Sequence, residues 1–295
     1  MKLINKLLVL CTALPLSIGA ASAAQVVVGG KNFTEQLLLS EMTTQLLTAK
    51  GHTVKKNDGL GSQVVRDAQV NGQVDVYWEY VGTSLVTYNK VNDRLDRQAA
   101  YDKVKELDAK QGVTWLSPSE ADNTYALAVL NGNAKTENIK TLSDLAASYN
   151  DGGKLLMAVN AEFPGRADGL PGLRKTYDFK TSRAVLRPMD SGLTYPALRD
   201  GQVDVALVFA TDGRVQAFNF RVLEDDKQFF PSYALAPVVR TSVLESTPEL
   251  AEPLNAMSAK LDSSVMQKLN ARVDVEKTPI EQVAKEFLSE SGLLN

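Results

Sequence analysis

The chain has 295 residues, 44% of them hydrophobic and 23% charged, which is enough for two domains of ordinary size. Its formal net charge is −3 and it contains no run of Lys or Arg, which argues against nucleic acid as a partner. A single cysteine excludes a disulfide framework and a metal site built on thiolates.

The first 24 residues have the pattern of a secretory signal peptide. Lys2 and Lys6 give a basic start, and an apolar stretch follows over residues 7–18. That stretch is too short to span a bilayer, which takes about 20 residues. Small residues come next, so we expect cleavage near Ala23 or Ala24 and a soluble exported protein of about 270 residues. That mature chain has 30 basic and 35 acidic side chains, because Lys2 and Lys6 are removed from the 32 basic residues of the whole sequence.

From residue 25 onward, short β-branched runs alternate with helical periods, a pattern typical of α/β proteins. Up to residue 122 the expected elements are strand 26–28 with a turn at Gly29-Gly30, helix 33–50, strand 53–56, helix 62–70, strand 74–78, a charged surface helix 93–110 and strand 113–116.

A polar start followed by an apolar strand at 122–129 is suited to carrying the chain from one lobe into another. The elements expected after it are helix 142–149, strand 155–159, a short helix around 173–177, strand 185–187, helix 192–199, strand 203–208, a loop over 224–233 and strand 234–239 running back. Residues 244–294 are predicted to be helical throughout and to pack on the first lobe.

The sequence Gly-Gln-Val-Asp-Val occurs twice, starting at Gly72 and at Gly201. Each copy follows a predicted helix and turn and opens a predicted strand. Aligning the copies puts Tyr80 opposite Phe209. Two similarly built halves would therefore each place an aromatic ring at the carboxyl end of a strand, which is where ligands sit in open α/β sheets.

Four aromatic residues lie at or near the ends of predicted strands: Tyr80, Tyr125, Phe209 and Tyr233. A quaternary ammonium group has no N–H to donate, so a protein recognises it through its diffuse charge and its methyl groups. Aromatic faces meet both needs, at about 0.5–2 kcal/mol for each well-placed ring. The pattern favours capture of a small cation, with core packing as the alternative for any single ring.

Catalytic motifs are scarce. His52 is the only histidine, so a nucleophilic triad or a histidine metal site would depend on one residue. The sequence has no nucleophile elbow, P-loop or dinucleotide fingerprint. Glu79, Asp122, Glu162 and Asp212 leave a two-carboxylate periplasmic hydrolase as an alternative. We expect no enzymatic activity, because acids at turns more often cap helices or accept hydrogen bonds.

Five motifs occur in order over nearly the whole mature chain, at residues 31–36, 79–83, 123–129, 162–169 and 211–213. They resemble those of periplasmic glycine betaine/choline-binding proteins, which serve osmoprotectant ABC transporters. The resemblance implies an α/β, two-lobed type II periplasmic-binding-protein fold with a ligand cleft between the lobes. Residues 25–122 with 232–295 would form lobe one, and residues 123–231 lobe two.

The resemblance also implies a set of ligand-binding residues. The aromatic box for a trimethylammonium group would be Tyr80, Tyr125, Phe209 and Tyr233. Arg166 matches the donor of a carboxylate clamp, with Lys31 and Thr83 beside it. Asn123 stands where some relatives have an aspartate near the cation, and Phe209 stands where a tyrosine is frequent.

The activity implied is binding without chemistry, in which the lobes close on the ligand and a membrane permease recognises the closed form. We expect a periplasmic monomer with no cofactor, no metal and no nucleic acid partner. Carriers of carnitine, proline betaine or an amino acid are alternatives within this class. A ligand-sensing module is a further one, because one fold serves many roles.

Overall fold

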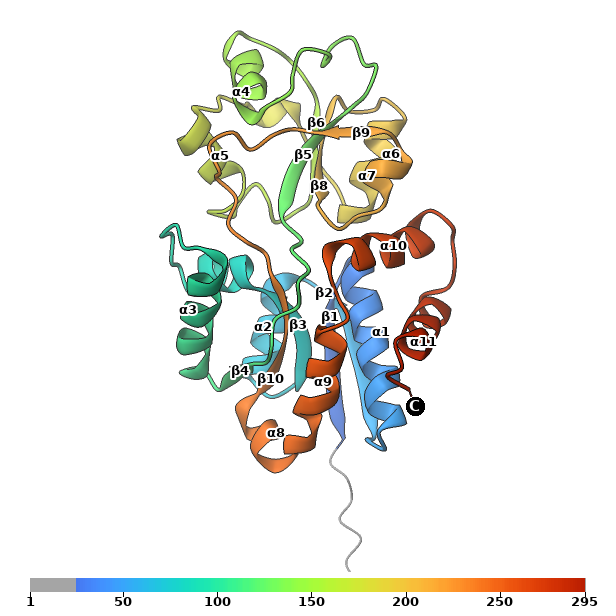
Figure 1. Cartoon of the computed structure of the whole chain (residues 1–295). Coiled ribbons are helices and arrows are strands. Elements are labelled where there is room, and N and C mark those ends of the chain that lie inside the picture. The colour runs from blue at the N-terminus through green and yellow to red at the C-terminus, as the bar shows by residue number, and fades with distance from the viewer. Residues whose placement is uncertain (1–24, 295) are drawn as a thin grey trace, which may run out of the picture.

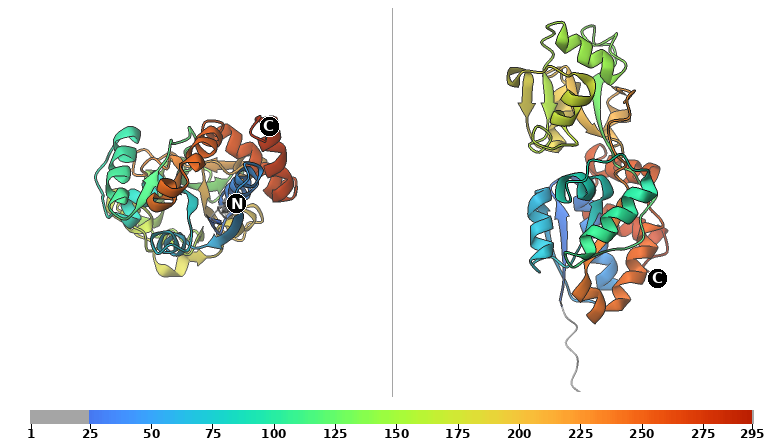
Figure 2. Two further views of the ribbon diagram at one scale, coloured as in Figure 1. Left: turned by 90° about the horizontal axis from the view of Figure 1, so that it is seen from below. Right: turned by 90° about the vertical axis from the view of Figure 1, so that its left-hand side faces the viewer.

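The computed structural model describes residues 25–294, so the predicted signal peptide lies outside the described residues. The described chain forms two lobes, one above the other, and each lobe is built on a five-stranded sheet (Figure 1). Figure 2 shows the same two lobes from two further directions. The predicted α/β fold with two lobes is confirmed. Among residues 25–294 no helix is both long enough and apolar enough to cross a bilayer.

The sheet of the first lobe has the strand order β2-β1-β3-β10-β4. Strands β2, β1 and β3 are parallel, and β10 runs antiparallel to its neighbours β3 and β4. The strands are β1 (Val26–Lys31), β2 (Val54–Leu60), β3 (Val76–Tyr80), β4 (Val113–Trp115) and β10 (Leu235–Arg240). The helices between them are α1 (Thr34–Ala49), α2 (Ser62–Val70), α3 (Arg97–Ala109) and the π-helical segment η1 (Thr83–Tyr88).

The sheet of the second lobe has the order β7-β6-β8-β5-β9. Strands β7, β6 and β8 are parallel, and β5 runs antiparallel to β8 and β9. The strands are β5 (Tyr125–Leu130), β6 (Met157–Val159), β7 (Leu186–Pro188), β8 (Val205–Phe209) and β9 (Phe220–Val222). The helices are α4 (Leu142–Asn150), α5 (Leu170–Tyr177), α6 (Thr194–Arg199) and α7 (Arg214–Ala217), with short 3-10 turns η2 (Arg183–Val185) and η3 (Ser191–Leu193).

The two sheets share one plan, and the repeated sequence motif explains how. Strands β3 and β8 occupy the same central place. Asp75 exchanges two hydrogen bonds with Val27, accepting from its N–H at 2.8 Å and donating to its carbonyl at 2.8 Å. Asp204 repeats both with Leu156, at 2.9 and 2.8 Å. The motif aspartate therefore anchors the central strand in each lobe, and the prediction of two similarly built halves is confirmed.

The chain crosses between the lobes through two segments that lie side by side. Asp122 pairs with Ala234 in an isolated antiparallel bridge. The Asp122 carboxylate accepts hydrogen bonds from the N–H of Tyr233 at 2.8 Å and from the hydroxyl of Ser232 at 2.5 Å. Strands before and after these crossings belong to the first sheet, and those between them to the second. On this basis we propose that residues 25–122 with 232–295 form lobe one and residues 123–231 form lobe two.

The predicted turn at Gly29-Gly30 is wrong, because β1 continues through both glycines to Lys31. A Cβ atom on Gly29 would lie 2.7 Å from the Val74 side chain, and one on Gly30 would lie 3.1 Å from the carbonyl oxygen of Gln36. Glycine is therefore needed here for close packing of strand against helix rather than for a change of direction. The other predicted elements up to residue 240 agree with the structure to within a few residues at their ends.

The C-terminal region is not helical throughout, as predicted, but breaks into separate helices. They are α8 (Thr241–Ser246), η4 (Pro248–Leu250), α9 (Ala251–Ser258), α10 (Ser263–Asp274) and α11 (Ile280–Glu290). Pro248 is the first residue of η4, and Pro279 directly precedes α11. Asp262 caps α10 by accepting a hydrogen bond from the Val265 N–H at 2.7 Å. Helices α9, α10 and α11 pack on α1 as expected. Helix α10 also contacts the second lobe, since Gln267 donates to the Ala210 carbonyl at 2.8 Å, which was not predicted.

The repeated aspartate can be tested by substitution. Asp75→Ala leaves the Val27 N–H without an acceptor and removes the partner of Arg240, which Asp75 binds at 2.8 Å. We expect the free energy of unfolding to fall by about 2 kcal/mol in urea denaturation. The control is Asp67→Ala at an exposed position of helix α2, where the change should be close to zero. Equal losses in both variants would contradict this role for Asp75.

Candidate ligand-binding site between the lobes

A cavity of about 210 Å³ lies between the lobes. It brings together all eight residues predicted from the sequence. Lys31, Tyr80, Thr83 and Tyr233 line it from the first lobe and its crossing segment. Asn123, Tyr125, Arg166 and Phe209 line it from the second lobe and its crossing segment.

The strand layout explains why these residues converge. Tyr80 is the last residue of β3 and Phe209 is the last residue of β8. The central strand of each sheet therefore ends in an aromatic ring at the cleft. Strands β5 and β10 run in the opposite direction and so begin at the same edge. Tyr125 is the first residue of β5, and Tyr233 stands two residues before β10.

The aromatic rings form one connected cluster. The ring centroid of Tyr125 lies 5.2 Å from that of Phe209 and 5.4 Å from that of Tyr233. Phe33 was not predicted, yet it lies parallel to Phe209 at 5.4 Å and stacks on Tyr80 at 6.2 Å. In the sequence, the only indication that Phe33 belongs to the site is its position in the motif at residues 31–36, directly before α1.

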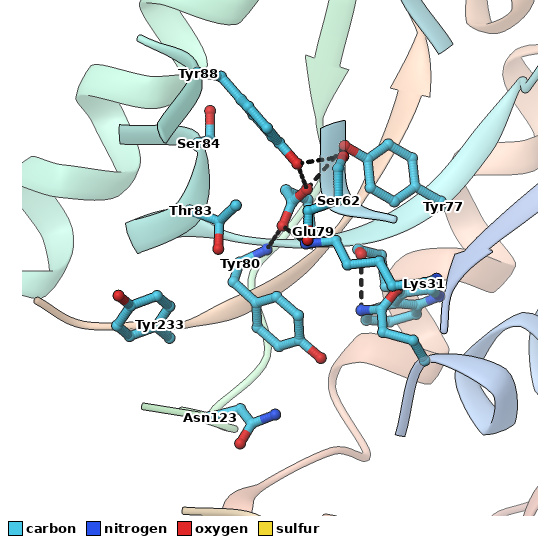
Figure 3. Close-up of polar contacts among 12 residues, drawn as sticks. Lys31, Ser62, Tyr77, Glu79, Tyr80, Thr83, Ser84, Tyr88, Asn123 and Tyr233 are labelled. Carbon is cyan, nitrogen blue, oxygen red and sulfur yellow. Dashed lines mark hydrogen bonds and ion pairs between the residues drawn. The ribbon is translucent and has the colours of Figure 1, made fainter. Parts of the chain in front are cut away.

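Lys31 is held in a buried network centred on Glu79 (Figure 3). Its ammonium donates to the Glu79 carboxylate at 2.5 Å, and the hydroxyls of Tyr77 and Tyr88 donate to the same carboxylate at 2.9 and 3.1 Å. Burial lowers the pKa of Lys31, and Glu79 opposes that shift. The ammonium also lies 4.9 Å from the ring centroid of Tyr80. Lys31 is therefore a fixed group whose charge is already balanced.

Arg166 is also fixed by a carboxylate. Its Nε and Nη2 donate to Asp168 at 2.8 and 2.6 Å, and Nη2 reaches the Thr83 hydroxyl at 3.3 Å. The Tyr233 hydroxyl donates to Asp168 at 2.6 Å. The remaining nitrogen, Nη1, has Glu162 at 3.5 Å. Asp168 belonged to a quoted motif but was not predicted as a site residue, because sequence does not reveal which acid pairs with which arginine.

Glu35 lies behind the aromatic cluster and is the main residue that the sequence did not reveal. It is 3% exposed and accepts hydrogen bonds from the Tyr80 hydroxyl at 2.8 Å, the Asn123 amide at 2.9 Å and the Asn270 amide at 3.0 Å, as well as from the Thr211 hydroxyl. Burial raises the pKa of Glu35, although all four hydrogen bonds favour its ionised form. In the sequence, an acid in the first turn of a helix is an ordinary helix-stabilising residue.

Two further contacts join the lobes around this cavity. At the start of α2, the Ser62 N–H donates to the Glu162 carboxylate at 3.0 Å. On the other side, Asp274 of α10 accepts from the Thr34 hydroxyl at 2.9 Å and pairs with Arg214 of the second lobe at 3.1 Å. The cavity is thus bordered by polar contacts that must rearrange if the lobes move.

Among the residues considered for other chemistry, Glu162 lines the cavity and Glu79 lies behind it, bonded to Lys31. His52 is half-buried and lies in the turn between α1 and β2, outside the cavity. Over residues 25–294, no three His, Cys, Asp or Glu side chains are arranged to hold a metal ion.

Comparison with known proteins gives a consistent result. A family model described as the substrate binding domain of an ABC-type glycine betaine transport system matches residues 24–290. The glycine-betaine-binding protein of Pseudomonas aeruginosa is 43% identical over 100% of this chain and 96% of its own length. Glycine betaine-binding protein YehZ of Escherichia coli K12 is 36% identical over 97% of this chain and 96% of its own length. A crystal structure described as a glycine betaine/carnitine/choline ABC transporter has a TM-score of 0.71 at 32% identity, covering 92% of this chain and 100% of that one.

The raised pKa of Glu35 predicts how stability depends on pH. Its ordinary value is 4.5, so the folded protein keeps this proton to a higher pH than the unfolded chain does. The stability that Glu35 contributes is complete below pH 4.5 and is lost as the pH rises through its folded pKa. We expect the unfolding free energy of Glu35→Gln, relative to wild type, to rise as the pH increases above 4.5, measured by urea denaturation. If the unfolding free energies of Glu35→Gln and wild type change with pH in the same way, this prediction is wrong.

Proposed function

The chain belongs to the family of substrate-binding domains of ABC-type glycine betaine transport systems, and from this membership we propose that it captures a quaternary ammonium osmoprotectant for a membrane permease. The ligand we propose is glycine betaine, choline or a related betaine. The observation that carries the proposal is the cavity between the lobes, walled by aromatic rings from both of them.

The aromatic walls suit a trimethylammonium group. Tyr80 and Tyr233 come from the first lobe and its crossing segment, and Tyr125 and Phe209 from the second, so a ligand between them would contact both halves. Burial raises the pKa of Tyr125 to about 12, so its ring stays neutral at physiological pH. At about 210 Å³ the cavity is smaller than the roughly 300–1,000 Å³ of pockets for drug-sized ligands, which fits a compact solute.

The carboxylate of a betaine would bind at Arg166. Asp168 fixes two nitrogens of the guanidinium, which leaves Nη1 for the ligand, with Glu162 at 3.5 Å as its competitor. A donor held in place loses little side-chain entropy on binding. The Thr83 hydroxyl and Lys31 line the same cavity beside it.

We propose binding and release without chemistry, since the family consists of transport binding proteins. Closure of the lobes on the ligand would give the form that the permease recognises. The mature protein would act in the periplasm as a monomer, after cleavage near Ala23 or Ala24.

The aromatic box predicts a loss of affinity on ring removal. Titration calorimetry with glycine betaine and choline should show Kd rising about 2- to 30-fold in Tyr125→Leu, which corresponds to 0.5–2 kcal/mol for one ring. The matched control is Phe218→Leu. The guanidinium of Arg166 lies 5.3 Å from the ring centroid of Tyr125, and that of Arg199 lies 4.9 Å from the centroid of Phe218, which is outside the cavity. Unchanged affinity in Tyr125→Leu, or binding of an ordinary amino acid only, would contradict the box.

The carboxylate clamp predicts selectivity. The double variant Arg166→Gln/Asp168→Asn removes both members of the buried ion pair, so neither is left as an unpaired buried charge. We expect Kd for glycine betaine to rise about tenfold or more, and Kd for choline, which has no carboxylate, to change little. The control is Arg199→Gln/Asp200→Asn, which removes a similar two-pronged pair at 2.7 and 3.0 Å on the surface. Equal weakening of both ligands would argue against a clamp at Arg166.

A further inference from the structure

We propose that Glu35 is the countercharge of the cavity, a specificity-determining residue that makes the site select a positively charged head group over a neutral group of the same shape. This inference rests on the proposed function and deepens it. Glu35 acts through Tyr80 and Asn123, which line the cavity, so it is a positioning residue and not a direct ligand contact.

The first step is the pairing of buried charges around the cavity. Lys31 is neutralised by Glu79 at 2.5 Å, and Arg166 by Asp168 at 2.6 Å. Both pairs are almost entirely buried. Within residues 25–294, no Lys or Arg forms an ion pair with Glu35. An ionised Glu35 is therefore a buried negative charge that the described chain does not balance.

The second step is that the hydrogen bonds fit the ionised form. The side-chain amides of Asn123 and Asn270 can only donate through their nitrogens, and both donate to Glu35. The hydroxyls of Tyr80 and Thr211 donate to it as well. Four donors directed at two oxygens match the acceptor sites of a carboxylate and leave no partner for an acid proton. Burial raises the pKa of Glu35, so desolvation works against the ionised form that these four donors favour.

The third step is the position of this charge relative to the ligand. Tyr80 links the two directly, because its ring faces the cavity while its hydroxyl donates to Glu35 at 2.8 Å. A phenol that donates to a carboxylate becomes more electron-rich, which strengthens its attraction for a cation at the ring face. Asn123 reaches the same carboxylate at 2.9 Å from the cavity floor.

The fourth step is that the second recess beside Glu35 is too small for a counterion. A recess of about 10 Å³ is lined by Glu35, Thr211, Asn270 and Arg214, and it shares Phe33, Asn123 and Phe209 with the ligand cavity. The guanidinium of Arg214 is itself paired with Asp212 and Asp274. That volume holds one water at most and has no room for a hydrated cation. Of these two spaces, the ligand cavity is the one with room for a cation that would compensate the Glu35 charge.

The test compares ligands that differ in charge but not in shape. Wild type and Glu35→Gln are titrated with choline, glycine betaine and 3,3-dimethylbutan-1-ol, in which carbon replaces the cationic nitrogen of choline. The neutral alcohol is measured by displacement if its own heat is small. We expect Kd for choline and glycine betaine to rise about tenfold in Glu35→Gln, while Kd for the neutral alcohol stays within about twofold.

Two further variants complete the design. Tyr80→Phe keeps the ring and removes the hydroxyl that joins it to Glu35. It should raise Kd for choline and glycine betaine by a smaller factor than Glu35→Gln does, and leave Kd for the neutral alcohol unchanged. It also carries the test alone if Glu35→Gln does not fold. The control is Glu41→Gln, a buried acid on the same helix that pairs with Lys56 at 2.6 Å and lies outside the cavity, where no affinity should change.

The outcomes separate cleanly. Equal weakening of all three ligands would mean that Glu35 has only a structural role, and unchanged choline binding would mean that it is no countercharge. Either result overturns the inference while leaving the proposed function standing. Failure of wild type to bind any quaternary ammonium would instead overturn the proposed function itself.

Discussion

Burial of ionised side chains between two lobes is the constraint on which the rest of this structure depends. Each buried charge must find a partner, because desolvation otherwise outweighs what the site gains. Glu79 and Asp168 supply those partners to Lys31 and Arg166, and in doing so they fix both cations in one geometry. The pocket is therefore largely pre-formed before any ligand arrives, which limits the entropy lost on binding.

The contacts of Glu35 also connect recognition with the arrangement of the lobes. Tyr80 belongs to the first lobe, Thr211 follows the central strand of the second, and Asn123 stands in a crossing segment. Any rotation of one lobe against the other changes the distances among these donors. A residue that stabilises the cation would thus also respond to how far the lobes have closed.

Much of the site could be predicted because the relevant signals are local. A strand end can be read from the sequence, and so can an aromatic residue at that end, which is why Tyr80 and Phe209 were found through a repeat. Pairings across long distances cannot be read in this way. Glu35 meets Asn270 only after α10 folds back, and Asp168 accepts from the Tyr233 hydroxyl only once that crossing segment returns to the site, 65 positions later. The packing role of Gly29 is likewise set by a valine 45 positions away.

The discontinuous build of the first sheet has a consequence for how the protein forms. Strands β5 to β9 come from one uninterrupted stretch, so their sheet can assemble as soon as that stretch is available. Strand β3 instead pairs with β10, and the whole of lobe two lies between them in the sequence. The pairing of Tyr80 with Leu235 therefore forms only after β10 is available. Contacts of such large sequence separation form slowly, and until they form β3 is an unprotected apolar edge. The lobe that begins the chain is thus expected to be the last to be completed, and the newly made polypeptide is most exposed to aggregation in that interval.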